Sequence, residues 1–214
     1  MKNWPALFLL ICLSTCHGSV KNVPDDFELG IAQNGIYSNQ YFGFEIKYDT
    51  SWKVHSRETL QNVSDLSREY LDKRDQNLKS VFDAAEVKTA RLFGLSQFEF
   101  GSIQGLNPSL MITVENVQNS TKIKTEKDYL KAARQTMIDA QMDFRISQEV
   151  HEKHIGNLDC YAVEMTIDYP FKGITQEYYI SLKRGFALGF IITYINQEQK
   201  EELHKMIESI NVQN

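Results

Sequence analysis

Two hydrophobic patterns follow one another along the chain, and their order predicts the fold. Residues 41–48 alternate, with Phe42, Phe44, Ile46 and Tyr48 on one side. A period of two is typical of a strand with one buried face. By the same reasoning, and from turn residues between the apolar segments, we predict further strands at about 91–99, 110–116, 145–155, 158–168, 175–183 and 186–194.

A helical period replaces the alternation between about residues 64 and 85. The apolar positions there are spaced by three, four and seven: Leu66, Tyr70, Leu71, Leu78, Val81 and Phe82. Charged residues four apart occupy the other side, which predicts a solvated face. A second helix is expected after the capping-box-like Thr125-Glu126-Lys127-Asp128, and a third after the N-cap residue Asn196.

These elements predict an α+β fold with a central antiparallel sheet. The strands between residues 145 and 194 are joined by short connections, which favour antiparallel hairpins. Residues 186–194 are apolar on both faces, so this strand belongs in the middle of a layered structure. We therefore expect helices on both faces of the sheet, in an α/β/α sandwich.

The N-terminus predicts export. Met1-Lys2-Asn3 is weakly positive and is followed by the apolar run from Ala6 to Leu13. This run is far shorter than the roughly 20 residues that span a bilayer. It is typical of the hydrophobic core of a signal peptide, which we place at residues 1–15.

A cysteine follows this leader directly. Leu13-Ser14-Thr15-Cys16 resembles the lipobox of bacterial lipoproteins, although Thr15 replaces the usual Gly or Ala. The resemblance makes Cys16 the lipid-attachment site, and residues 16–34 are expected to form a flexible tether. Ordinary cleavage after Gly18, giving a soluble periplasmic or secreted protein, is the alternative.

Length and charge limit the function. Residues 35–214 are long enough for one domain with one core. The precursor has a net charge of −5, and loss of residues 1–15 removes Lys2 alone, which leaves −6. Phosphate-dominated binding of nucleic acid is therefore not expected.

The first predicted strand also carries a family resemblance. The segment from Ile36 to Tyr48, followed by Trp52-Lys53-Val54, resembles the opening of Mog1/PsbP-like domains, with the pattern Tyr-x-Asn-x-Tyr-Phe-Gly-Phe. The closing Ser209-Ile210-Asn211-Val212 is similar to the family's end. The resemblance implies a central antiparallel sheet flanked by helices and includes bacterial envelope lipoproteins such as DcrB. It implies no catalytic residue, and the charged helix at about 64–85 departs from the pattern.

Candidate chemistry is sparse. His151 and His154 are spaced by three on a predicted strand, so they point to opposite faces and do not predict a metal site. Cys160 is expected to be a buried small side chain rather than a nucleophile. Residues 101–108 are predicted to form a turn region. We expect no metal and no cofactor.

The sequence thus favours a non-catalytic lipoprotein of the bacterial cell envelope that binds a partner protein or a small ligand. Its expected membrane contact is an N-terminal lipid anchor. The alternative is a hydrolase whose site is assembled only in three dimensions, with a buried carboxylate pair beside residues 101–108 as its signature.

Overall fold

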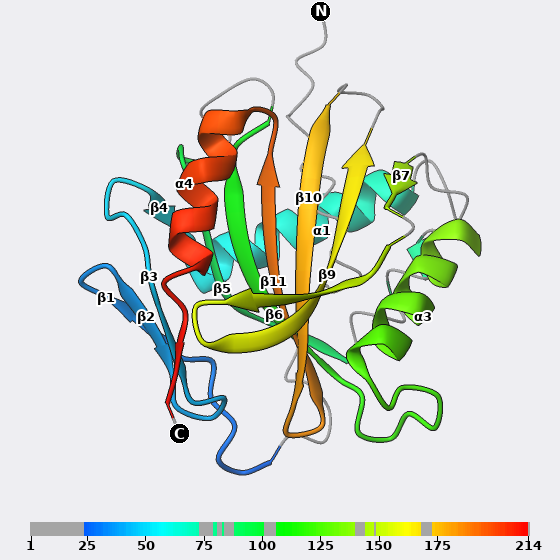
Figure 1. Ribbon diagram of the computed structural model, residues 1–214. Helices are drawn as coiled ribbons and strands as arrows, with labels where there is room; N and C mark the ends of the chain where they lie inside the picture. The colour runs from blue at the N-terminus through cyan, green and yellow to red at the C-terminus, as the bar shows by residue number, and fades with distance from the viewer. Residues whose placement is uncertain are drawn as a thin grey trace, which may run out of the picture.

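A large antiparallel sheet forms the centre of the structure, a computed structural model that describes residues 24–72, 79–80, 83, 88–100, 106–139, 144–147, 149–167 and 173–213. Its strand order is β4-β5-β6-β11-β10-β9-β7, and β8 also pairs with β9 (Figure 1). The strands are β4 (Lys53–Val54), β5 (Thr89–Ser96), β6 (Ser109–Asn116), β7 (Phe144–Ile146), β8 (His151–Ile155), β9 (Leu158–Ile167), β10 (Ile174–Lys183) and β11 (Phe186–Tyr194).

A second, four-stranded antiparallel sheet lies beside the large one. Its order is β1-β2-β3-β12, with β1 (Ile31–Gln33), β2 (Ile36–Asn39), β3 (Phe44–Lys47) and β12 (Asn211–Val212). The sequence predicted one sheet. The alternation predicted over residues 41–48 corresponds to β3 of this sheet, whereas β1 and β12 have three and two residues, too few for a period of two to be recognised.

The helices are α1 (Arg57–Asp72), α3 (Glu126–Asp139) and α4 (Gln197–Ile207). The structure is therefore mixed α+β with antiparallel sheets, as predicted. Both expected caps form: Asp128 N–H donates to Thr125 Oγ1 at 3.2 Å, and Gln199 N–H donates to Asn196 Oδ1 at 2.9 Å.

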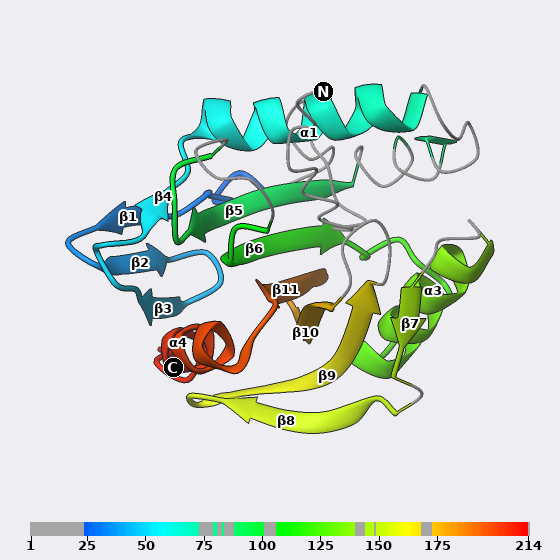
Figure 2. The ribbon, with the colours of Figure 1, turned by 90° about the horizontal axis from the view of Figure 1, so that it is seen from above.

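Helix α1 begins earlier than predicted. Ser56 Oγ accepts a hydrogen bond from the backbone N–H of Thr59 at 3.0 Å and so caps the helix before residue 64. Leu60 is buried. Figure 2 shows α1 lying along β5 and β6. The apolar stripe predicted between Leu66 and Phe82 lies outside the side chains that the structure describes.

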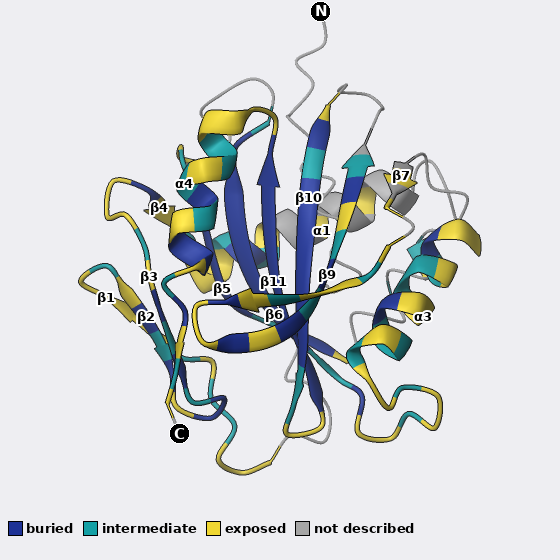
Figure 3. Ribbon diagram, in the orientation of Figure 1, coloured by how far each residue is buried: buried dark blue, intermediate teal, exposed yellow. Residues whose placement is uncertain are grey.

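Strand β11 is the most deeply placed strand of the large sheet. All nine of its residues are buried, and it pairs with β6 on one side and β10 on the other (Figure 3). Both faces of this strand are covered, as the apolar pattern of residues 186–194 predicted. Helix α4 contacts β11 and β3, whereas α3 contacts β9 and β10.

The predicted strand at 145–155 is divided into β7 and β8, and both pair with β9. The ordered domain also begins before residue 35. Within the predicted tether, Ile31–Gln33 pairs with β2, and the Phe27 ring stacks on Phe186 with centroids 5.6 Å apart. Strand pairing and this ring contact, rather than deep burial, hold the segment to the domain, because Ile31–Gln33 is exposed and Phe27 is partly buried.

The β8–β9 turn lies against Ile210, so it provides a test of how the C-terminal segment is held. Gly156 has a φ of +56°, and an added Cβ would collide with the backbone carbonyl of Ile210. Gly173 has a φ of +87°, and nothing lies within 4 Å of an added Cβ there. We predict that Gly173→Ala lowers the free energy of unfolding by about 1 to 2 kcal/mol, the cost of a left-handed backbone.

Gly156→Ala should cost at least about 2 kcal/mol more, because the clash is added to the backbone term. Urea denaturation of both variants, followed by circular dichroism, measures the difference. Equal losses of stability would show that the turn moves away from Ile210 without cost.

Candidate functional site

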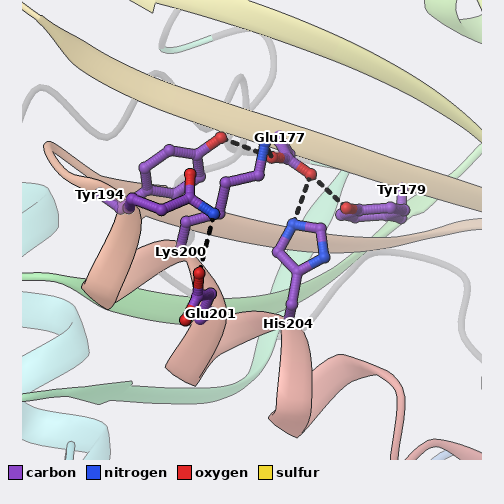
Figure 4. Close-up of polar contacts among 7 residues, drawn as sticks. Glu177, Tyr179, Tyr194, Lys200, Glu201 and His204 are labelled. Atoms are coloured by element: carbon purple, nitrogen blue, oxygen red, sulfur yellow. Dashed lines mark hydrogen bonds and ion pairs between the residues drawn. The ribbon is translucent and has the colours of Figure 1, made fainter.

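A group of titratable side chains surrounds Glu177 of β10. We define the Glu177 cluster as Glu177, Tyr179, Tyr194, Lys200 and His204 (Figure 4). The spacing of these residues on their strands and helix brings them together. Glu177 and Tyr179 are two apart on β10 and so share a face, and Lys200 and His204 are four apart on α4 and so lie one turn from each other.

Each oxygen of the Glu177 carboxylate has two partners. The Tyr194 hydroxyl donates to Oε1 at 2.5 Å, and Lys200 Nζ lies 3.0 Å from the same oxygen. The Tyr179 hydroxyl donates to Oε2, and His204 Nε2 lies 3.0 Å from that oxygen. Glu177 is 8% exposed, so these four groups replace the water that its carboxylate has lost.

The electrostatic consequence is an ionised buried carboxylate. Burial raises the pKa of Glu177, but the hydrogen bonds from His204, Tyr179, Tyr194 and Lys200 outweigh it and hold the pKa well below its usual range. Burial, and hydrogen bonding to the carboxylate, raise the pKa of both Tyr179 and Tyr194. At neutral pH Glu177 is charged and the two tyrosines are neutral.

This arrangement suits a structural link better than acid–base chemistry. A general acid or base works best with a pKa near the working pH, whereas the pKa of Glu177 lies far below it. A nucleophile in a triad would need a hydrogen bond to Nδ1 of His204, and no described side chain makes one. The cluster joins α4 to β10 and β11 and leaves no group of Glu177 free to react.

Cys160 behaves as the sequence predicted. It is 4% exposed, and its thiol donates to the Lys153 carbonyl at 3.3 Å. Burial, together with the charge of Asp159, raises its pKa to about 12, so it stays a neutral thiol.

The two histidines of β8 do not come together in a metal site. His154 Nδ1 contacts Asp159 Oδ1 at 2.6 Å in an exposed pair. Within the described ranges, no group of three or more His, Cys, Asp or Glu side chains is placed to hold a metal ion.

The other sequence-predicted positions have different outcomes. Cys16 lies outside the described residues, as do residues 101–105. Beside them, Asn107 is buried, and its amide donates to Ser96 Oγ at 3.2 Å and to the Phe98 carbonyl at 2.7 Å. Asn107 therefore links the residues before β6 to the end of β5.

The residues that carry the family resemblance have structural roles. Tyr37 stacks on Phe93 with ring centroids 4.7 Å apart. Asn39 Oδ1 accepts from Phe42 N–H at 2.8 Å, which shapes the β2–β3 turn. Phe44 meets Phe190 edge to face at 5.4 Å. The motif thus fastens the second sheet to the large one.

The Glu177 cluster was missed from the sequence. One signal was available: Lys200 and His204 are spaced by four on the predicted last helix, and Glu177 is the single carboxylate of the predicted strand at 175–183. A single carboxylate in a buried strand needs a partner. The partner's identity, however, depends on how α4 crosses the sheet, and the sequence does not determine that crossing.

In the part of the chain that the structure describes, no helix has the length and apolar character required to cross a bilayer.

Comparisons with known proteins agree with this fold. No protein-family model matches the sequence, and no curated protein matches it. Among solved structures, the cyanobacterial PsbP (CyanoP) of Synechocystis sp. PCC 6803 is similar, with a TM-score of 0.50 at 11% identity over 92% of this chain and 100% of that one. The chain therefore has a PsbP-like fold, as the sequence resemblance implied.

Two further structures are more distantly similar. LpqN, described as involved in cell envelope biogenesis of Mycobacterium tuberculosis, has a TM-score of 0.44 at 9% identity and covers 80% of this chain and 83% of its own. A protein of Bacteroides thetaiotaomicron has a TM-score of 0.45 at 10% identity over 80% of this chain. The chain spans about half of that protein's length, 46%.

The Glu177 cluster gives a prediction about stability and pH. Glu177→Gln removes the charge that Lys200 and His204 face, and should lower the free energy of unfolding by about 3 kcal/mol at pH 7. Because the folded-state pKa is depressed, the contribution of Glu177 is complete above the unfolded-state value of about 4.3 and is lost as the pH falls toward the folded-state value. The difference between wild type and variant should thus be constant above about pH 5 and shrink below it.

Glu201→Gln is the matched control. Glu201 lies on the same helix, is exposed and pairs with Gln197 Nε2 at 3.1 Å. Loss of the Glu201 charge should change the free energy of unfolding by less than about 0.5 kcal/mol at any pH between about 4 and 8. Denaturant titrations across this range make the comparison, and a pH-independent deficit in Glu177→Gln would contradict an ionised carboxylate.

Proposed function

We propose that this protein is a non-catalytic lipoprotein of the bacterial cell envelope, anchored through Cys16, that binds a partner protein or a small ligand. The observation that carries the proposal is the closed Glu177 cluster, in which Lys200, His204 and two tyrosines engage all of the buried carboxylate. Within the described residues, the titratable groups gathered around Glu177 thus serve packing. The lipobox-like Leu13-Ser14-Thr15-Cys16 supports the anchor.

The proposal includes the three-layer α/β/α architecture expected from the sequence. It is supported by the contacts of α4 with β11 and of α3 with β9 and β10. The side chains gathered around α3, such as Leu130, pack on Ile180 and Ala187, whereas those of α4 belong to the main core with Phe190. Successive residues of a strand face opposite sides, so these neighbours are consistent with helices on two faces.

A hydrolase remains the second candidate, and one observation favours it. His204 Nε2 lies 3.0 Å from Glu177, and the His204 side chain is 25% exposed, so a carboxylate–histidine pair reaches the surface. The absence of a described nucleophile beside His204, and the low pKa of Glu177, count against it.

The anchor is tested on the mature protein. Expressed with its own leader in a bacterial host, the wild-type chain should begin at Cys16, carry a diacylglycerol mass and sediment with membranes. Cys16→Ser should be unmodified and should leave the membrane fraction, because the acyl chains supply the attachment. Mass spectrometry of an unmodified chain that begins at Ser19 would refute the anchor.

The hydrolase candidate has a separate test. We expect the purified domain to show no turnover of ester, amide and glycoside substrates above a buffer blank. If turnover is found, Glu177→Gln and His204→Ala should be compared with Glu201→Gln at equal concentrations of folded protein. Loss of activity in the first two variants alone would establish the hydrolase and overturn the non-catalytic proposal.

A further inference from the structure

The first described residues lie at one end of the domain. Because the proposed lipid anchor precedes them in the chain, their position indicates which end lies nearest the membrane. Phe27 packs against Tyr41, Phe42 and Phe186, the last of which directly follows the β10–β11 turn. Asp26 Oδ2 lies 3.6 Å from Arg184 of that turn. The segment from Pro24 is therefore fixed beside the turn, at the lower edge of Figure 1.

We call this region the anchor end. It consists of residues 24–28, Lys88, Glu115, the loop of residues 117–125 with the first turn of α3, and residues 183–185. Its parts are joined by contacts: Val117 N–H donates to the Gly185 carbonyl at 3.0 Å, and Asn116 N–H donates to the Lys88 carbonyl at 2.9 Å.

Chain length keeps this end close to the lipid. Only residues 17–23 separate Cys16 from Pro24, and even a fully extended chain of that length reaches at most about 29 Å. The nine residues of β11 extend roughly 30 Å from the anchor end to the opposite end of the domain. The short tether thus favours contact at the near end.

The charge distribution points the same way. The basic side chains of the anchor end are Lys88, Lys122, Lys124, Lys127, Lys183 and Arg184, and its acidic ones are Asp25, Asp26, Glu28, Glu115, Glu126 and Asp128. The two sets balance, so the net charge of −6 of the mature chain lies elsewhere on the molecule.

Several of the carboxylates at the anchor end also accept hydrogen bonds from groups of the domain itself. Glu115 accepts from the Tyr129 hydroxyl at 2.9 Å, and Glu126 accepts from Leu182 N–H at 2.9 Å. Asp128 accepts from Thr125 N–H at 2.9 Å. The exposed charged residues of this end are five basic ones, Lys88, Lys122, Lys124, Lys127 and Arg184, and two acidic ones, Asp25 and Asp26, so the exposed charge of this end is positive on balance.

We propose that the anchor end faces the membrane and that Lys122, Lys124 and Lys183 contact the phosphates of anionic lipid headgroups. The proposal rests on the lipid anchor at Cys16. Attraction to an anionic surface acts within a Debye length of about 8 to 10 Å, which the tether allows at this end. The acidic remainder of the domain is repelled by the same surface.

The test uses the full-length lipidated protein, whose lipid is first verified by mass, bound to vesicles of phosphatidylethanolamine and phosphatidylglycerol that contain a headgroup quencher. Fluorophores are attached at Thr121→Cys in the anchor end or at Glu198→Cys at the start of α4, both exposed positions. Buried Cys160 does not compete for label. We expect at least threefold stronger quenching at position 121 than at position 198.

Charge reversal identifies the contact. Lys122→Glu/Lys124→Glu should remove at least half of the quenching at position 121. Lys53→Glu/Lys205→Glu, the same change of charge outside the anchor end, should leave it unchanged. For the protein with its lysines unchanged, vesicles of phosphatidylcholine alone should reduce the quenching at position 121 as much as Lys122→Glu/Lys124→Glu does.

Three outcomes would overturn the inference. Equal quenching at the two positions, with lipid present, refutes the orientation while leaving the anchor intact. A preference for position 121 that survives both phosphatidylcholine and the reversed lysines refutes the phosphate contact. A mature protein without lipid refutes the anchor itself, and the inference with it.

Discussion

The domain depends on keeping water away from both faces of β11. All nine residues of this strand are buried, and β6 and β10 satisfy its backbone on the two sides. One face is covered by α4 and by the aromatic residues of the second sheet, for example where Phe44 meets Phe190. A strand buried in this way cannot be stable in a single-layered structure, because its second face would be left in water. The second sheet and α4 are therefore requirements of the core rather than additions to it.

Covering that face brings a charge into the interior. Glu177 is on the strand beside β11, under α4, and an isolated carboxylate there would be strongly unfavourable. Lys200 and His204 reach it from α4, and two tyrosines reach it from the sheet. The same contacts that keep Glu177 ionised also fix the position of the helix. Buried charges with complete partners can specify one arrangement among several of similar apolar burial.

Sequence patterns predicted the long elements and missed the short ones. Five long elements appear close to their expected bounds because eight or more positions in each repeat a period: β9, β10, β11, α3 and α4. β1 and β12 have three and two residues, so only tertiary pairing reveals them. Helix α1 began before its apolar stripe because Ser56 caps it. The Glu177 cluster combines residues from two strands and a helix, and no local pattern encodes their meeting.

The family-like motif explains why the fold could be recognised while the molecular task could not. Tyr37, Asn39 and Phe44 are held by contacts that any domain with this pair of sheets needs: a ring stack on Phe93, a turn closed at Phe42 and an edge-to-face contact with Phe190. None of them reaches a cluster that could perform chemistry. Selection for packing preserves such residues whatever the domain binds, so they identify architecture alone. Features that distinguish this protein from others of its fold are therefore expected on surfaces that packing does not constrain, where exposed lysines such as Lys122 and Lys124 lie.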